Sequence, residues 1–331
     1  MPVAESPAPD GSAPRARCPI EPLDPVITSI QPGGGICMRL ELAWGRIRRW
    51  YLRTFRGGYV ARMREKLRGT PVNVPHEVLD PRDLKFYRNQ GDFGWAPEDD
   101  PFTWRDRLPF VRAGLAELLL IGGGLAGITA ATAWWFWPVA VVPGAVTALV
   151  LWFFRNPRRT IPTDPGLVVS PADGKVVSIE EIAHDEFLGG PAVAIGIFLS
   201  VFNVHVNRIP IHGRVVGMTY HRGKFLNALL AASARENEQL HLRFEEETAP
   251  HRRVIVKQIA GAIARRIVCW VRPGEVLARG EQFGMIKLGS RTELILPREP
   301  GLKIETRVGQ AVAAGSSVLA RYDNGKGTSD G

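Results

Sequence analysis

Residues 281–294 read Glu-Gln-Phe-Gly-Met-Ile-Lys-Leu-Gly-Ser-Arg-Thr-Glu-Leu, so the pair Gly289-Ser290 lies just before a strand-like run, Thr292–Leu296. Similar runs of β-branched or alternating residues, bounded by Gly and Pro, predict further short strands. They cover 167–170, 175–179, 192–199, 214–218, 253–257 and 267–271. One helix is expected over Lys224–Ala234. Residues 160–331 are therefore predicted to form a mainly β domain, a sandwich or barrel with a few helices.

A weak internal repeat gives a second interpretation of the same domain. Residues 274–280 and 309–315 share the pattern G-x-x-h-A-x-G, which resembles the glycine turns of biotinyl and lipoyl carrier domains. In that alternative the chain is a membrane-tethered carrier or binding module without self-cleavage, and Gly289-Ser290 is only a turn. Such a carrier displays a lysine at a tight hairpin, for which Met285-Ile-Lys287 is a poor imitation.

The composition restricts the partners and the compartment. The net charge of +9 and the isoelectric point near 9.8 favour acidic partners, and the apolar segment described below favours anionic lipid over nucleic acid. The chain's 3 cysteines lie far apart, which argues against a disulfide scaffold and favours a reducing compartment. The 7 histidines are scattered, so no metal site is predicted.

The region before the β domain divides into three parts. Residues 1–37, rich in Pro, Gly, Ser and Ala, are predicted to be a disordered extension. Residues 38–113 are predicted to be a basic amphipathic helix followed by an irregular connector. The helix carries an apolar stripe at spacings of three and four residues, formed by Leu40, Trp44, Ile47, Tyr51 and Phe55. A basic helix with such a stripe suits an anionic membrane surface, although packing on the rest of the protein would explain it too.

Residues 114–159 form the third part and are predicted to be a hydrophobic membrane hairpin. A run from Leu118 to Trp137 is long enough to cross a bilayer, and a second run follows Pro138 to Phe154. Arginines flank the pair on both sides, so the positive-inside rule predicts both ends in the cytoplasm. A buried hairpin in a soluble core or a shallow re-entrant insertion would give the same pattern.

Three motifs in order resemble one known family. Phe283-Gly-Met-Ile-Lys-Leu-Gly-Ser-Arg291 resembles the self-processing site of the short-form phosphatidylserine decarboxylases. Ser170-Pro-Ala-Asp-Gly-Lys175 and Phe202-Asn-Val-His-Val-Asn-Arg-Ile-Pro210 resemble two further segments of that family. The resemblance covers about residues 150–331 and does not extend to residues 1–113.

The resemblance implies a pyruvoyl-dependent lyase that is made as an inactive precursor. The chain would be cut between Gly289 and Ser290, and Ser290 would become a covalent pyruvoyl cofactor that forms a Schiff base with the substrate amine. The α and β fragments would remain together as a heterodimer. The implied reaction converts phosphatidylserine to phosphatidylethanolamine at the cytoplasmic face of the inner membrane.

Two side chains are expected to assist Ser290. The serine hydroxyl is a weak nucleophile at neutral pH and needs a general base. The resemblance assigns that role to His205, with Asp173 orienting the imidazole as in a catalytic triad. Other members of the family carry a second histidine where this chain has Arg208, and the nearby His212 is the alternative base.

Overall fold

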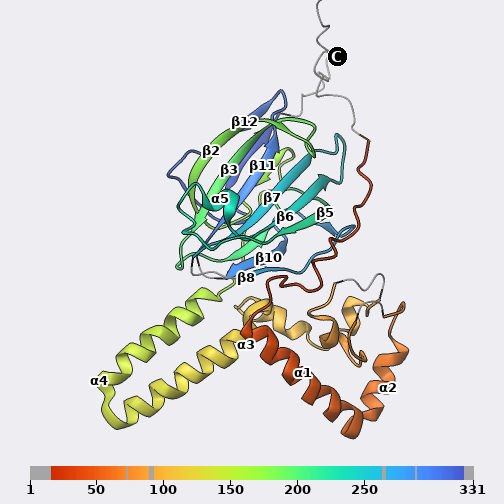
Figure 1. Cartoon of the computed structure of the whole chain (residues 1–331), viewed down its shortest axis with the longest axis vertical. Coiled ribbons are helices and arrows are strands. Elements are labelled where there is room, and N and C mark those ends of the chain that lie inside the picture. Colours follow the sequence, from red (N-terminus) through yellow and green to blue (C-terminus); the bar gives the residue numbers. More distant parts are fainter. Residues whose placement is uncertain (1–15, 72–73, 89–92, 263–265, 288, 324–331) are drawn as a thin grey trace, which may run out of the picture.

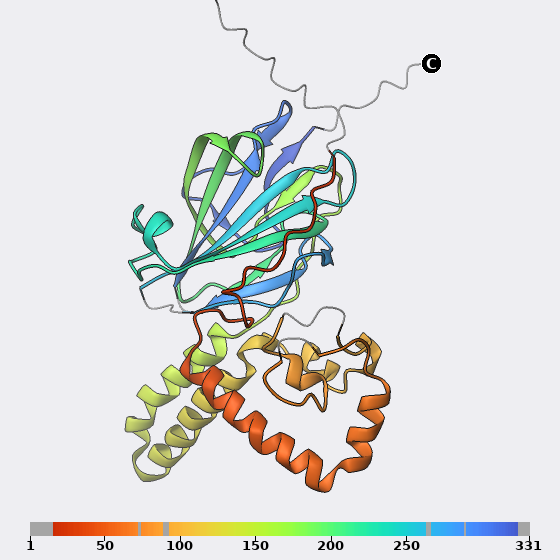
Figure 2. The same cartoon turned by 45° about the vertical axis from the view of Figure 1, so that its right-hand side comes forward.

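The structure, a computed structural model, describes residues 16–71, 74–88, 93–262, 266–287 and 289–323. A β domain lies at one end of the molecule, and a helical part formed by residues before 155 lies at the other (Figures 1 and 2). The prediction of a mainly β domain after residue 160 is confirmed.

Three sheets build the β domain. The largest has the order β13-β2-β3-β11-β7-β6-β5-β9, and the two smaller sheets have the orders β4-β10-β8 and β1-β14-β12. The strands of the large sheet are β2 Gly174–Asp185, β3 Gly190–Leu199, β5 Gly213–His221, β6 Gln239–Glu246, β7 Arg253–Ala260, β9 Val276–Leu277, β11 Ser290–Pro297 and β13 Ala311–Val312. The others are β1 Leu167–Val169, β4 Val206–Arg208, β8 Arg266–Cys269, β10 Gln282–Lys287, β12 Leu302–Ile304 and β14 Val318–Tyr322.

Strand β11 is central to this architecture. It pairs antiparallel with β3 and β7, and all of its residues are buried. Strand β10 precedes it and belongs to the second layer, where the ring of Phe283 packs on that of Phe244 from the large sheet, with centroids 5.7 Å apart. The chain therefore changes layer between Lys287 and Ser290, and Ser290 begins the central strand inside the protein.

The helix predicted over Lys224–Ala234 is wrong. Only a short helix is present, α5 Ser233–Glu236. The Asn237 side chain accepts a hydrogen bond from the Leu226 N–H at 2.8 Å and donates to the Leu226 carbonyl at 2.9 Å. These bonds hold the preceding segment in a non-helical path, so a tertiary contact overrides the local helix propensity.

The disorder predicted for residues 1–37 does not hold for the part that the structure describes, and residues 1–15 lie outside the described residues. Residues 16–35 run along the β domain (Figure 2). Glu21 pairs with Arg243, the Cys18 N–H donates to Glu245 at 2.7 Å, and Ile27 is fully buried. Partners on β6 therefore order a segment whose composition alone favours disorder.

The basic region forms two helices, α1 Ile36–Phe55 and α2 Gly57–Glu65. All five side chains of the predicted stripe are exposed, between 46% and 62%. The connector after them contains short 3-10 turns, Pro81–Leu84, Pro97–Asp99, Thr103–Arg107 and Arg112–Gly114. Arg48 bridges α1 to Asp80 and Asp83, so the connector is packed and not loose.

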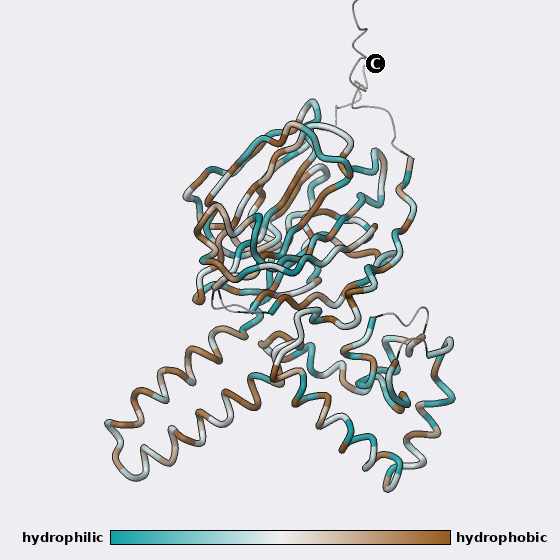
Figure 3. The backbone as a smooth tube through the Cα atoms, viewed as in Figure 1, coloured by the Kyte–Doolittle hydropathy of each residue, from teal (hydrophilic) through white to brown (hydrophobic). Residues whose placement is uncertain are grey.

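A long apolar helical segment joins the connector to the β domain. It comprises α3 Leu115–Glu117, a π-helical turn Leu118–Gly122 and α4 Gly123–Phe153. Phe136 has non-helical backbone angles that mark a kink inside α4. The ribbon of α4 turns back on itself and forms two arms (Figure 1). The hydroxyls of Thr129 and Thr147 lie 3.4 Å apart across the two arms. The hydropathy colouring shows apolar residues along both arms (Figure 3), and the segment Arg112–Phe153 is long and apolar enough to cross a membrane.

Candidate active site

Gly289 and Ser290 form the turn between the two layers. Gly289 has φ +62°, a left-handed conformation that glycine adopts at little cost. Ser290 is fully buried, and its hydroxyl oxygen has no hydrogen-bond partner among the residues that the structure describes. A buried hydroxyl without a partner is costly, and such groups in native proteins often have a chemical role.

His205 reaches this turn from the segment just before β4. Its Nε2 accepts a hydrogen bond from the Gly289 N–H at 3.2 Å, and its Nδ1 lies 2.9 Å from the Asn203 carbonyl oxygen. Because a carbonyl only accepts, Nδ1 carries the proton and Nε2 presents its lone pair. The residue is fully buried, and the ring of Phe153 packs on it with centroids 4.4 Å apart.

Burial also sets the charge of His205. The pKa of the imidazole is lowered to about 4, chiefly by removal from water and to a smaller degree by the charge of Arg155, while the hydrogen bond to the Asn203 carbonyl acts in the opposite direction. The ring is therefore neutral at physiological pH. The imidazole contacts Gly289, the residue before Ser290. Because it is neutral, it has the protonation state that a general base needs.

Asp173 is not brought to His205. Both of its carboxylate oxygens accept from the same Arg159 nitrogen, at 2.9 and 2.7 Å, and one also accepts from the Ala314 N–H at 2.7 Å. The Asp–His contact expected from the resemblance is replaced by the Asn203 carbonyl. Asp173 thus ties the segment after the apolar helix to the loop after β13.

The two other candidates at this segment are also placed elsewhere. Arg208 is buried and donates to the Gly280 carbonyl at 2.8 Å, so it holds a turn together. His212 is exposed, and its Nδ1 lies 3.1 Å from the Leu277 carbonyl oxygen on β9. Of His205, Arg208 and His212, only His205 contacts the Gly289-Ser290 turn in the described structure.

Sequence reasoning missed Gly261, which follows β7. A methyl group added at its Cα would lie 2.3 Å from the carbonyl oxygen of Gly289 and 3.3 Å from Cβ of Ala228. Glycine is therefore required here so that the Gly289 carbonyl can lie against β7. A glycine directly after a strand is a signal of such a close backbone approach, but it does not name the partner.

A buried ion pair next to the turn was missed as well. Lys287, the last residue of β10, pairs with Glu117 at the start of the apolar helix, and both side chains are about nine-tenths buried. One oxygen of Glu117 has no further hydrogen-bond partner in the described part of the chain. The pair fixes the end of β10, two residues before Gly289, to the apolar helix.

Comparison with known proteins places this site in a family. The profile of the phosphatidylserine decarboxylase family matches residues 146–320. The chain belongs to the phosphatidylserine decarboxylase family. It is 55% identical to the phosphatidylserine decarboxylase proenzyme of Rhodopirellula baltica over 242 residues, which are 73% of this chain and 100% of that protein. The proenzyme of Syntrophus aciditrophicus is 43% identical over 67% of this chain and 99% of its own length.

Family membership confirms the predicted enzyme class, a decarboxylase. The 242 matched residues of the Rhodopirellula baltica proenzyme exceed the length of the region 150–331. The similarity therefore extends through the apolar helix into the connector, and the prediction that it leaves out residues 1–113 is wrong for the end of that region.

Proposed function

We propose that this chain converts phosphatidylserine to phosphatidylethanolamine with a pyruvoyl group that it makes from its own Ser290. The observation that carries the proposal is the buried, unpartnered Ser290 hydroxyl beside Gly289, with the lone pair of His205 directed at the same turn. The names of the relatives, phosphatidylserine decarboxylase proenzymes, support both the substrate and the processing.

The processing reaction would begin with the Ser290 hydroxyl. Its oxygen attacks the Gly289 carbonyl carbon while His205 Nε2 accepts the hydroxyl proton, and that proton passes to the departing amide nitrogen. The peptide C–N bond is thereby exchanged for an ester. Loss of the α-proton of residue 290 then expels Gly289 as a carboxylate and leaves dehydroalanine. Water converts the dehydroalanine to the pyruvoyl group and releases ammonia.

The residues present fit this cofactor. A pyruvoyl group is small and uncharged, and the residue 290 position is fully buried at the start of β11, between its strand partners Leu199 and Ala260. When present, the group withdraws electrons from the bond that loses CO₂. The Nδ1–H of His205 is bonded to the Asn203 carbonyl, so Nε2 is the nitrogen directed at the Gly289 turn. His205 can therefore accept or deliver a proton there through Nε2.

We further propose that the two arms of α4 insert in the inner membrane as a hairpin from the cytoplasmic side, while α1 lies on the surface. The exposed apolar side chains of both elements support this arrangement, because water is an unfavourable solvent for so many of them. Arginines flank the apolar segment on both sides, for example Arg112 and Arg155. The Lys287–Glu117 pair would then hold the processing site near the membrane.

The intact mass of the purified protein tests the processing. We expect two fragments, residues 1–289 and a 42-residue piece that begins with the blocked, pyruvoyl-derived residue 290. Ser290→Ala should leave the chain whole and unable to decarboxylate phosphatidylserine in vesicles. Ser316→Ala is the matched control, since Gly315-Ser316 is another Gly-Ser pair, and it should be processed normally. An uncut wild-type chain with full activity would refute the proposal.

A further inference from the structure

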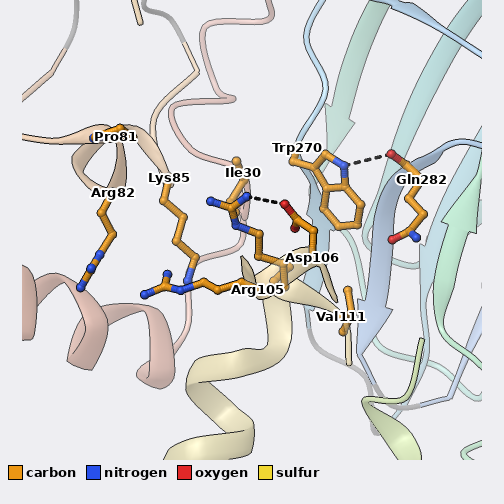
Figure 4. A pocket seen from close by; sticks show the side chains of 11 residues that line it. Ile30, Pro81, Arg82, Lys85, Arg105, Asp106, Val111, Trp270 and Gln282 are labelled. Atoms are coloured by element: carbon orange, nitrogen blue, oxygen red, sulfur yellow. Dashed lines mark hydrogen bonds and ion pairs between the residues drawn. The ribbon is translucent and has the colours of Figure 1, made fainter. Parts of the chain in front are cut away.

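A pocket away from Ser290 lies between the connector, the start of the apolar helical segment and the β domain (Figure 4). Its volume is about 340 Å³, within the usual range of small-ligand sites. Apolar side chains form part of the wall, among them Ile30, Val111 and Trp270. The charged residues of the wall are four cations, Arg82, Lys85, Arg105 and Arg112, and one acid, Asp106.

Two of these cations form ion pairs with carboxylates in the described part of the chain. Lys85 pairs with Glu41 at 2.7 Å, and Arg112 pairs with Asp100 at 2.8 Å and with Asp106 at 3.1 Å. Among the residues that the structure describes, Arg82 and Arg105 have no carboxylate within ion-pair distance.

Arg82 and Arg105 converge on one ring. Their guanidinium carbons lie 3.9 and 4.7 Å from the centre of Phe102. The Nε of Arg82 is buried and has no hydrogen-bond partner in the described chain. Partial burial and the charges of Arg82 and Arg112 lower the pKa of Arg105. An anion bound in the pocket that both arginines line would weaken the repulsion between these cations.

We propose that this pocket binds the phosphate of an anionic phospholipid. Guanidinium groups are suited to phosphate because they present parallel N–H donors. A lipid is favoured as the source because Arg112 and Ala113 directly precede the apolar helical segment. Acyl chains of a bound lipid could lie along that segment while Ile30 and Val111 cover the glycerol end.

The pocket is separate from the processing site. Gln282 lines the pocket and begins β10, whereas Lys287 ends this strand beside the Gly289 turn. A strand rises about 3.3 Å per residue, so these two positions are roughly 16 Å apart. A lipid in the pocket would thus be a second lipid that holds the protein on an anionic membrane, and it need not be the substrate.

Binding to the full-length protein in neutral detergent tests the inference independently of cleavage. The probes are dioctanoyl-phosphatidylglycerol, dioctanoyl-phosphatidylcholine, glycerol 3-phosphate and inorganic phosphate, each titrated by calorimetry. We expect phosphatidylglycerol to bind more tightly than the other three. Loss of charge-assisted hydrogen bonds in the double variant Arg82→Gln with Arg105→Gln should weaken that binding by about tenfold or more.

Arg107→Gln is the matched control, because Arg107 is an exposed arginine that does not line the pocket. It should bind phosphatidylglycerol within about twofold of the wild type. Arg105→Gln alone serves if the double variant does not fold, and should still weaken binding several-fold. Equal binding of phosphatidylglycerol by the Arg105→Gln variant and the wild type would overturn the proposal. So would inorganic phosphate or phosphatidylcholine binding as tightly as phosphatidylglycerol.

Discussion

Gly261→Ala is expected to slow self-cleavage without removing any proposed catalytic group. The added methyl carbon would lie 2.3 Å from the Gly289 carbonyl oxygen, whereas even close carbon–oxygen contacts are about 3.3 Å. The carbonyl that Ser290 is proposed to attack must therefore move by roughly 1 Å. A displacement of that size in a reacting group can lower a rate by about 100-fold. Because the neighbours are the backbone and Ala228, the strain cannot be relieved by a flexible side chain.

Pulse-labelled precursor made by cell-free synthesis with lipid nanodiscs provides the assay. The fraction of whole chain is followed on gels over time and checked by intact mass. Gly190→Ala is the control, since a methyl group there meets nothing within 4 Å, and it should be cut at the wild-type rate. Thermal unfolding of both variants in a Ser290→Ala background separates slow chemistry from lost folding. Wild-type cleavage by a folded Gly261→Ala chain would refute the placement of the scissile carbonyl against β7.

Three further outcomes are expected. The cleavage rate should stay nearly constant from pH 9 to pH 5 if His205 is the base, because a pKa of about 4 leaves the imidazole neutral throughout that range. A cleavage rate that falls to half near pH 6.5, the ordinary pKa of histidine, would contradict this assignment. Asp173→Asn should lower the thermal midpoint by weakening the bond to Arg159, yet slow cleavage less than tenfold; an uncut but equally stable variant would restore a direct role in the chemistry. Lys287→Met should lower the free energy of unfolding by about 3 kcal/mol, because Glu117 is left buried and unpaired. Adding Glu117→Gln should restore most of that stability, as measured by denaturant titration. A single Lys287→Met variant as stable as the wild type would show that the ion pair does not stabilise the protein.

The β domain could be predicted because its strands carry their own signals. The runs that became β3 and β7 are β-branched and bounded by glycine or proline, so their pattern does not depend on the rest of the chain. Strand β6 was missed because Gln239–Glu246 contains several charged and polar residues. Two of them, Arg243 and Glu245, have partners on the N-terminal segment, Glu21 and Cys18, which no local pattern reveals.

The candidate site was predictable only in part, for the same reason. Ser290 and Gly289 are neighbours in sequence, so their motif states their relation directly. The partner of His205 depends on which groups the fold brings to its Nδ1, and here a backbone carbonyl two residues away occupies that position. A carboxylate partner is a property of three-dimensional packing, and Asp173 is engaged by Arg159 instead.

The neutral partner of His205 has a consequence for the proposed chemistry. A carboxylate would stabilise the charged imidazolium and raise its pKa, whereas the Asn203 carbonyl offsets only part of the cost of burial. His205 is therefore a weak base, and efficient turnover at neutral pH favours a base with a pKa nearer to 7. The proposed self-cleavage would happen once in the life of each chain, so it would not require rapid proton transfer. A buried, weakly basic histidine is thus adequate for processing, and the same low pKa keeps it neutral beside the apolar surroundings of residue 290.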